Sequence, residues 1–150
     1  MRALPESAKP PCAEVRRYAV VALTNLTFGN ASIKSYLCGY PSFVTIMVDQ
    51  LRLQKTSMSS DNLRKATAHL FRNLAWKADK GSKQVLAESD VVAVLVRAAM
   101  DVGARMNSAG GDGKDVEPAL KVILSALWNL SAHCRKNKVK LHYFLCIINP

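Results

Sequence analysis

Three asparagines stand among large apolar residues in stretches that otherwise read as buried helices. Asn25 lies in ALTNLTF, Asn73 in LFRNLAW and Asn129 in ALWNLSA, and each has a leucine one position later. Asparagine is a poor helix former, and an unpaired buried amide costs about 1–3 kcal/mol. An amide offers both a donor and an acceptor, which suits the backbone of an extended peptide. The pattern predicts an internal repeat with a ladder of peptide-binding amides. The alternative is that each amide pairs with a neighbouring backbone inside the scaffold.

Basic residues recur at a fixed distance from these asparagines. Arg17, Lys65 and Lys121 each lie eight positions before one of them. At about 100° per residue, this position shares the helix side of the asparagine. With Arg72 and Lys77, these cations would attract acidic side chains of a partner and speed encounter. The alternative is an ordinary solvated helix face.

Two tryptophans lie beside the predicted ladder. Trp76 comes three positions after Asn73, and Trp128 comes one position before Asn129. Tryptophan is enriched at binding hot spots, so both are candidate anchors for a partner. We favour partner contact for Trp76. Trp128 falls at the edge between two helix faces and would equally pack against a next repeat.

No pattern of residues predicts catalysis, a metal site or a cofactor. The chain has no GxSxG, phosphate loop or HExxH motif. His133, Cys134, His142 and Cys146 can bind metals, but their spacing matches no common zinc pattern. We therefore expect a nonenzymatic protein without metal or cofactor.

Composition favours a globular unit that binds something acidic. The chain has 150 residues, is 49% hydrophobic and carries a formal charge of +10. Its 4 cysteines form no dense framework, which predicts a reducing, intracellular compartment. The longest uncharged stretch, residues 18–33, is shorter than the roughly 20 apolar residues of a spanning helix, so we expect no membrane span. The positive charge leaves open an alternative function, a helical-repeat protein that binds nucleic acid.

The elements that would position these residues are helices, because the apolar spacing follows a period of 3.6. We expect three helices per repeat, at 79–88, 90–102 and 115–132 in the middle unit. Polar or glycine-rich stretches at 53–62 and 103–115 predict inserted loops.

Several residues should begin these helices. Asp79 and Asp90 occupy N-cap positions, and Pro118 falls in a first turn. In the preceding unit, the first helix would begin at Asn30 or Ser32, the second at Pro41 and the third at Asp61.

The core should lie on the side of each asparagine helix that faces away from the ladder. Positions six before, two before and one after each asparagine share that side. They are Ala19, Leu23 and Leu26; Thr67, Phe71 and Leu74; and Ile123, Leu127 and Leu130.

Four stretches, RRYAVVALTNLTFGN, LFRNLAWKAD, SKQVL and LSALWNLSAHC, resemble the armadillo repeats of the adenomatous polyposis coli family. The resemblance runs from about residue 16 to about residue 137. It implies an all-α, right-handed armadillo α-solenoid of about three repeats. Residues 1–14 would be irregular, 15–137 would hold the repeats, and 138–150 would form an incomplete or divergent repeat helix.

The resemblance also implies a function. Members of this family are noncatalytic scaffolds of Wnt signalling, tumour suppressors that act in the complex that destroys beta-catenin. Their armadillo domain holds partner segments in a basic concave groove, including those of the exchange factor Asef, the kinesin-associated protein and the Amer proteins. Beta-catenin binds other regions of the longer proteins. The resemblance implies a cytoplasmic location, with nuclear, cell-cortex or microtubule-associated pools.

Overall fold

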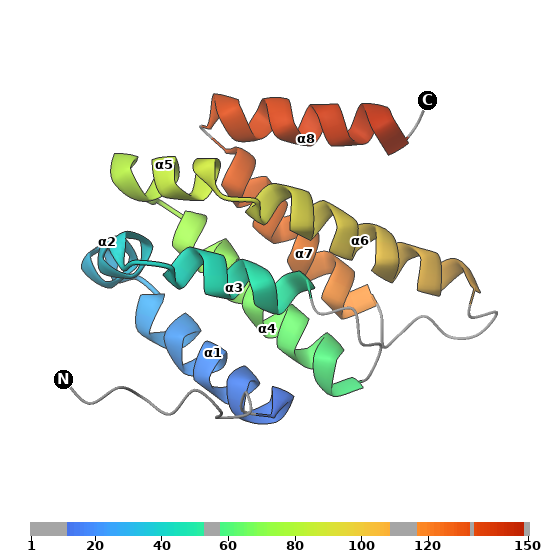
Figure 1. Ribbon diagram of the computed structural model, residues 1–150, viewed down its shortest axis with the longest axis horizontal. Coiled ribbons are helices and arrows are strands. Elements are labelled where there is room, and N and C mark those ends of the chain that lie inside the picture. Colours follow the sequence, from blue (N-terminus) through green and yellow to red (C-terminus); the bar gives the residue numbers. More distant parts are fainter. Residues whose placement is uncertain (1–11, 53–57, 109–116, 133, 149–150) are drawn as a thin grey trace.

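The computed structural model describes residues 12–52, 58–108, 117–132 and 134–148, and within these ranges every regular element is a helix (Figure 1). In chain order the helices are α1 (Ala13–Thr27), α2 (Ala31–Gly39), α3 (Phe43–Arg52), α4 (Met58–Ala75), α5 (Lys80–Glu88), α6 (Val91–Ser108), α7 (Glu117–Ser131) and α8 (Arg135–Ile148).

The helices form successive units of three. Helices α2–α4 make one unit and α5–α7 the next, while α1 corresponds to α4 and α7, and α8 corresponds to α2 and α5. Helix α1 packs on α4 and α4 packs on α7, with α3 against α4 and α6 against α7 (Figure 1). This arrangement confirms the predicted all-α solenoid of about three repeats. Among the described residues, no helix combines the length and apolar character needed to cross a bilayer.

The predicted helix starts agree with the structure at most positions. The Asn30 carboxamide oxygen accepts a hydrogen bond from the Ile33 amide at 3.0 Å and so caps α2. Asp79 caps α5 in the same way, through a 2.9 Å bond from the Ser82 amide. Helix α3 begins two residues after Pro41, because Ser42 adopts a left-handed conformation with φ 62°.

Two helices extend into segments that we expected to be loops. Helix α4 begins at Met58, three residues before Asp61, and α6 continues to Ser108, so that Gly103 is helical. An ion pair of 2.6 Å between Arg105 Nη1 and Asp61 Oδ2 joins these two extensions and explains part of the difference. The remainder of the expected loops, 53–57 and 109–115, lies outside the described residues, as do residues 1–11.

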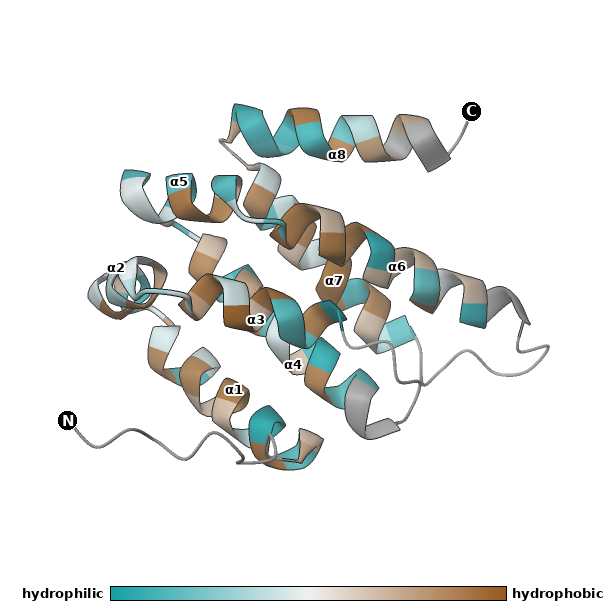
Figure 2. Cartoon of the chain, in the orientation of Figure 1, coloured by the Kyte–Doolittle hydropathy of each residue, from teal (hydrophilic) through white to brown (hydrophobic). Residues whose placement is uncertain are grey.

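The predicted core is correct for α4 and α7 and wrong in part for α1. Thr67, Phe71, Leu74, Ile123, Leu127 and Leu130 are all buried. In α1, however, Ala19 is exposed and Leu26 is 56% exposed. No described helix lies beside α1 in the place that α3 takes beside α4, so this side of α1 has nothing to pack against. The apolar segments of the other helices face one another in the interior (Figure 2).

Candidate functional site

The stacked helices α1, α4 and α7 bring the three asparagines into one column. Asn73 Nδ2 donates to the Thr24 carbonyl at 3.1 Å, and Asn129 Nδ2 donates to the Arg72 carbonyl at 3.1 Å. In each case the acceptor is the residue just before the asparagine of the preceding repeat. The amides therefore join adjacent repeats to one another.

These bonds use only part of each amide. A carboxamide has two N–H donors and one oxygen acceptor, so one N–H and the oxygen remain after the bond to the scaffold. Asn73 and Asn129 are half-buried, and Asn25 is exposed. The scaffold alternative thus accounts for one donor of Asn73 and one of Asn129. The remaining polar atoms are held in a fixed orientation at the surface.

The predicted ladder face is accessible along its length. None of the positions eight before, four before and three after the asparagines is buried. They are Arg17, Val21 and Phe28; Lys65, His69 and Trp76; and Lys121, Ser125 and Ala132.

A cleft of about 320 Å³ gathers four of the predicted residues. Trp76 and Lys77 line it from the end of α4, Trp128 and Asn129 line it from α7, and Lys83 reaches it from α5. The tryptophans are 56% and 75% exposed, so both rings are accessible. The Lys77 ammonium lies 5.9 Å from the centre of the Trp76 ring. Aromatic, amide and cationic groups therefore meet at one place.

Trp128 borders a second, apolar cleft of about 500 Å³ between α6, α7 and α8. Met100, Leu124 and Leu141 also line that cleft. Both roles considered for Trp128 are thus compatible with its position.

Lys77 has an unusual backbone for a lysine. Its φ is 50°, in the left-handed region, directly after the end of α4. Gly29 occupies the equivalent place after α1, with φ 67°. Glycine is the residue that takes this helix-ending conformation at low cost. A lysine here therefore carries a backbone cost that a glycine would avoid.

Lys34 and Lys83 form a pair of equivalent lysines that the sequence analysis did not identify. Each lies four residues after a helix-capping residue, Asn30 or Asp79. Lys34 is only 4% exposed, and its ammonium donates to the Trp76 carbonyl at 2.8 Å. Burial lowers the pKa of Lys34, and the charge of Lys77 adds to this effect. The recurrence of cap-plus-four lysines was the available sequence signal.

The basic column that we predicted is largely neutralised by its own helices. Arg17 Nε lies 2.9 Å from a Glu14 carboxylate oxygen, and Lys121 Nζ lies 2.6 Å from Glu117. The bond to Glu14 raises the pKa of Arg17, and the bond from Lys121 lowers the pKa of Glu117. Lys65 forms no ion pair with a described carboxylate. The column thus contributes less positive potential than its composition indicates.

His69 lies on the ladder face between these cations. Burial lowers its pKa, and the charges of Arg72 and Lys65 lower it further. The ring is therefore neutral at neutral pH and can both donate and accept a hydrogen bond.

The geometry offers binding groups rather than reactive ones. Within the described ranges, no three His, Cys, Asp or Glu side chains are grouped so that they could hold a metal ion, and His133 lies outside those ranges. Oriented amides, exposed indoles and ammonium groups can hold the backbone, an apolar side chain and an acidic side chain of an extended peptide.

Comparison with known proteins gives a consistent result. The chain is 42% identical over 127 residues to the adenomatous polyposis coli homolog of Xenopus laevis, and 40% identical over the same length to the adenomatous polyposis coli protein of Homo sapiens. It is 38% identical over 127 residues to adenomatous polyposis coli protein 2 of Homo sapiens. No family model matches it.

Each of these matches covers 85% of the chain. The matched region is only 4–5% of the length of these relatives. Over this region the chain belongs to the adenomatous polyposis coli family.

Proposed function

We propose that the chain is a noncatalytic scaffold element that binds extended, acidic peptide segments of partner proteins. The observation that supports this most is the 320 Å³ cleft, where Trp76, Trp128 and Asn129 meet the ammonium groups of Lys77 and Lys83. A partner backbone would pair with the free amide atoms. An apolar side chain would enter between the indoles, and an acidic side chain would lie near the lysines.

By similarity to its family, the chain would act as a negative regulator of Wnt signalling in the beta-catenin destruction complex. Its partners would include the Asef-type exchange factor, the kinesin-associated protein and the Amer proteins, while beta-catenin would bind elsewhere in longer relatives. The corresponding location is cytoplasmic, with pools in the nucleus, at the cell cortex or on microtubules.

Fluorescence polarisation of a labelled acidic Asef-type peptide tests the proposal. We expect micromolar binding that Asn73→Ala and Trp76→Ala each weaken at least about tenfold, the size typical of interface hot spots. Tyr36→Ala is the matched control, because Tyr36 is an exposed aromatic residue on α2 outside the cleft.

Single-stranded RNA serves as the competing ligand. Binding of RNA with a steep salt dependence, together with no binding of the peptide, would contradict the proposal and favour the nucleic-acid alternative.

A further inference from the structure

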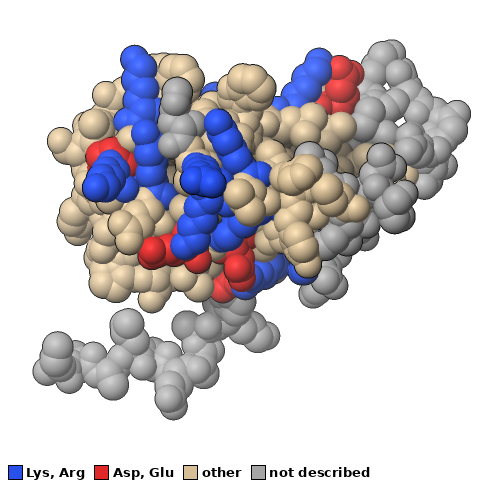
Figure 3. Space-filling view, turned by 90° about the horizontal axis from the view of Figure 1, so that it is seen from above, with Lys and Arg blue, Asp and Glu red and all other residues tan. Residues whose placement is uncertain are grey.

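A third cleft, which shares Lys83 with the 320 Å³ cleft, is lined by cations that form no ion pair with a described carboxylate. Lys80 and Lys83 line it from α5, and Arg135 and Lys136 line it from α8, around a volume of about 570 Å³. None of these four forms an ion pair with a described carboxylate. Arg17, Arg52, Arg64, Arg105 and Lys121 have carboxylate partners. Lys65, Arg72 and Lys77 also form no ion pair with a described carboxylate. Figure 3 shows several lysine and arginine side chains on the face seen from above, with some aspartate and glutamate side chains among them.

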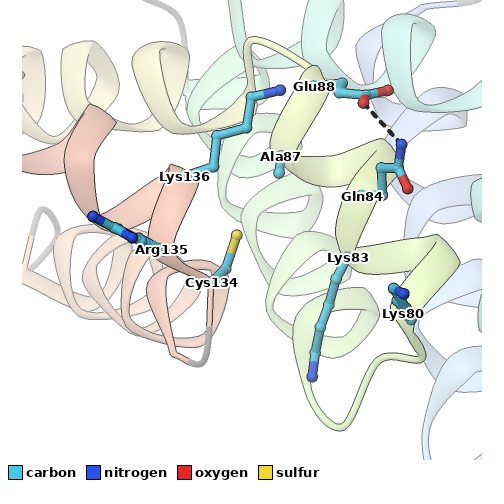
Figure 4. Close-up of a pocket in the computed structure, with 8 residues that line it drawn as sticks. All are labelled: Lys80, Lys83, Gln84, Ala87, Glu88, Cys134, Arg135 and Lys136. Atoms are coloured by element: carbon cyan, nitrogen blue, oxygen red, sulfur yellow. Dashed lines mark hydrogen bonds between the residues drawn. The ribbon is translucent and has the colours of Figure 1, made fainter.

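The charges around this cleft are unequal. Four cations but only one carboxylate, that of Glu88, line the cleft, and Glu88 accepts a hydrogen bond from Gln84 Nε2 at 3.1 Å. Figure 4 shows Cys134 and Lys136 directed from α8 toward α5, whereas Arg135 lies on the outer side of α8. Because these lysine and arginine side chains are long and mostly exposed, they can adjust to an anion between the helices.

The Ser82 amide, in the first turn of α5, is not available to this anion. The Asp79 side chain already accepts from the Ser82 amide and hydroxyl at 2.9 and 2.6 Å. These bonds lower the pKa of Asp79, with the bond from the Ser82 hydroxyl having the largest effect. An anion in this cleft would therefore depend mainly on the lysine and arginine side chains that line it.

Lys83 connects this cleft to the 320 Å³ cleft, because it lines both. In Figure 4 its side chain extends away from that of Lys136. A peptide that engages Trp76 and Asn129 would thus carry a neighbouring residue past Lys83 into the gap between α5 and α8. The excess of cations over carboxylates along this gap suits the dianionic charge of a phosphate monoester better than the single charge of a carboxylate.

We propose that the cleft between α5 and α8 is a subsite for a phosphorylated serine or threonine of the bound partner segment. This inference rests on the proposed peptide-binding function. Phosphorylation of the partner would then strengthen its binding to this chain.

The test uses the full 150-residue chain and the labelled acidic peptide, synthesised with serine, aspartate or phosphoserine at each position in turn. At 150 mM salt we expect one position at which phosphoserine binds about tenfold tighter than serine and also tighter than aspartate. The double variant Arg135→Gln, Lys136→Gln should reduce this ratio to below about twofold. Glu88→Gln should increase it, because that change removes the carboxylate from the cleft.

The outcomes separate this subsite from the proposed function. If the serine peptide binds in an Asn129-dependent manner and phosphoserine gives no gain at any position, the subsite is wrong and the peptide groove stands. If no peptide form binds, both fail. If a short RNA binds more tightly than the phosphopeptide and loses affinity in the double variant, the cleft serves nucleic acid and the inference is overturned. Circular dichroism melting of the double variant checks that it remains folded.

Discussion

Lys77 combines an unfavourable backbone conformation with a position in the candidate groove, and this makes it a sharp test of the reasoning. Its φ of 50° places an L-residue in the left-handed region, which costs about 1–2 kcal/mol, whereas glycine adopts it freely. Lys77→Gly should relieve that cost. Lys77→Ala should retain it while removing the same charge and the same contact with Trp76.

The two variants therefore separate stability from binding. Glycine increases the entropy of the unfolded chain, which offsets about 0.5–1 kcal/mol of the relief. The glycine variant should thus be more stable than the alanine variant by about 0.5–1 kcal/mol, or a melting temperature about 1–4 °C higher for a chain of this size. Both variants should bind the acidic peptide equally weakly, because each lacks the ammonium group.

Thermal unfolding and fluorescence polarisation on the same preparations provide the comparison. An alanine variant as stable as the glycine variant would show that the backbone at this position is not strained. Unchanged peptide affinity in both variants would show that the lysine is outside the binding site. Either result would refute part of the argument, and the two results are independent.

Three further predictions concern the scaffold around the groove. Asn129→Ala loses a hydrogen bond worth about 0.5–1.5 kcal/mol but gains helix propensity, so the free energy of unfolding should change by less than about 1 kcal/mol. The Asn25 amide forms no side-chain bond to another described residue, so Asn25→Ala should be neutral or stabilising. A loss above about 2 kcal/mol for Asn129→Ala in urea unfolding would assign its amide to stability alone. The pKa of His69 is lowered in the folded state, so the unfolded state binds more protons and stability should fall as the pH drops from about 6.5 toward the folded pKa. His69→Gln should flatten this part of the dependence of the urea midpoint on pH. An identical dependence in the variant would contradict the assignment. Lys34→Met removes the ammonium that donates to the Trp76 carbonyl just after α4 and should lower the melting temperature by about 2–4 °C, whereas the same change at the exposed Lys80 should leave it unchanged. Equal melting temperatures for the two variants would show that this bond adds nothing to stability.

The fold was predictable from sequence because its signals are local and repeated. Helical periodicity placed α5, α6 and α7, and the side-chain caps at Asn30 and Asp79 marked two helix starts. The end of α6 was missed, because the ion pair between Arg105 and Asp61 that stabilises it joins residues 44 positions apart. A glycine at 103 then looked like a loop, although it lies inside a helix.

The site was only partly predictable for the same reason. A helical wheel placed Asn73 on the accessible side, but it contains no information about a carbonyl 49 residues away. The neutralisation of Arg17 and Lys121 is different, because Glu14 and Glu117 lie three and four residues earlier, a spacing that typically pairs charges on a helix. That signal was present in the sequence and was overlooked.

The distribution of paired and unpaired cations changes where the positive potential of this protein should act. On α1 and α7 the cations of the predicted column pair with carboxylates of their own helices. On α5 and α8 the lysines and arginines around the 570 Å³ cleft have no such partner among the described residues. An acidic partner would thus be attracted to the edge formed by α5 and α8 as well as to the unpaired Lys65 and Lys77 beside the ladder. It would then be held by the asparagines and tryptophans of α4 and α7. Removing charge at Arg135 and Lys136 should therefore slow association of the acidic peptide and leave its dissociation rate unchanged, whereas Asn129→Ala should mainly speed dissociation. Stopped-flow measurements that gave the reverse assignment would contradict this division of roles.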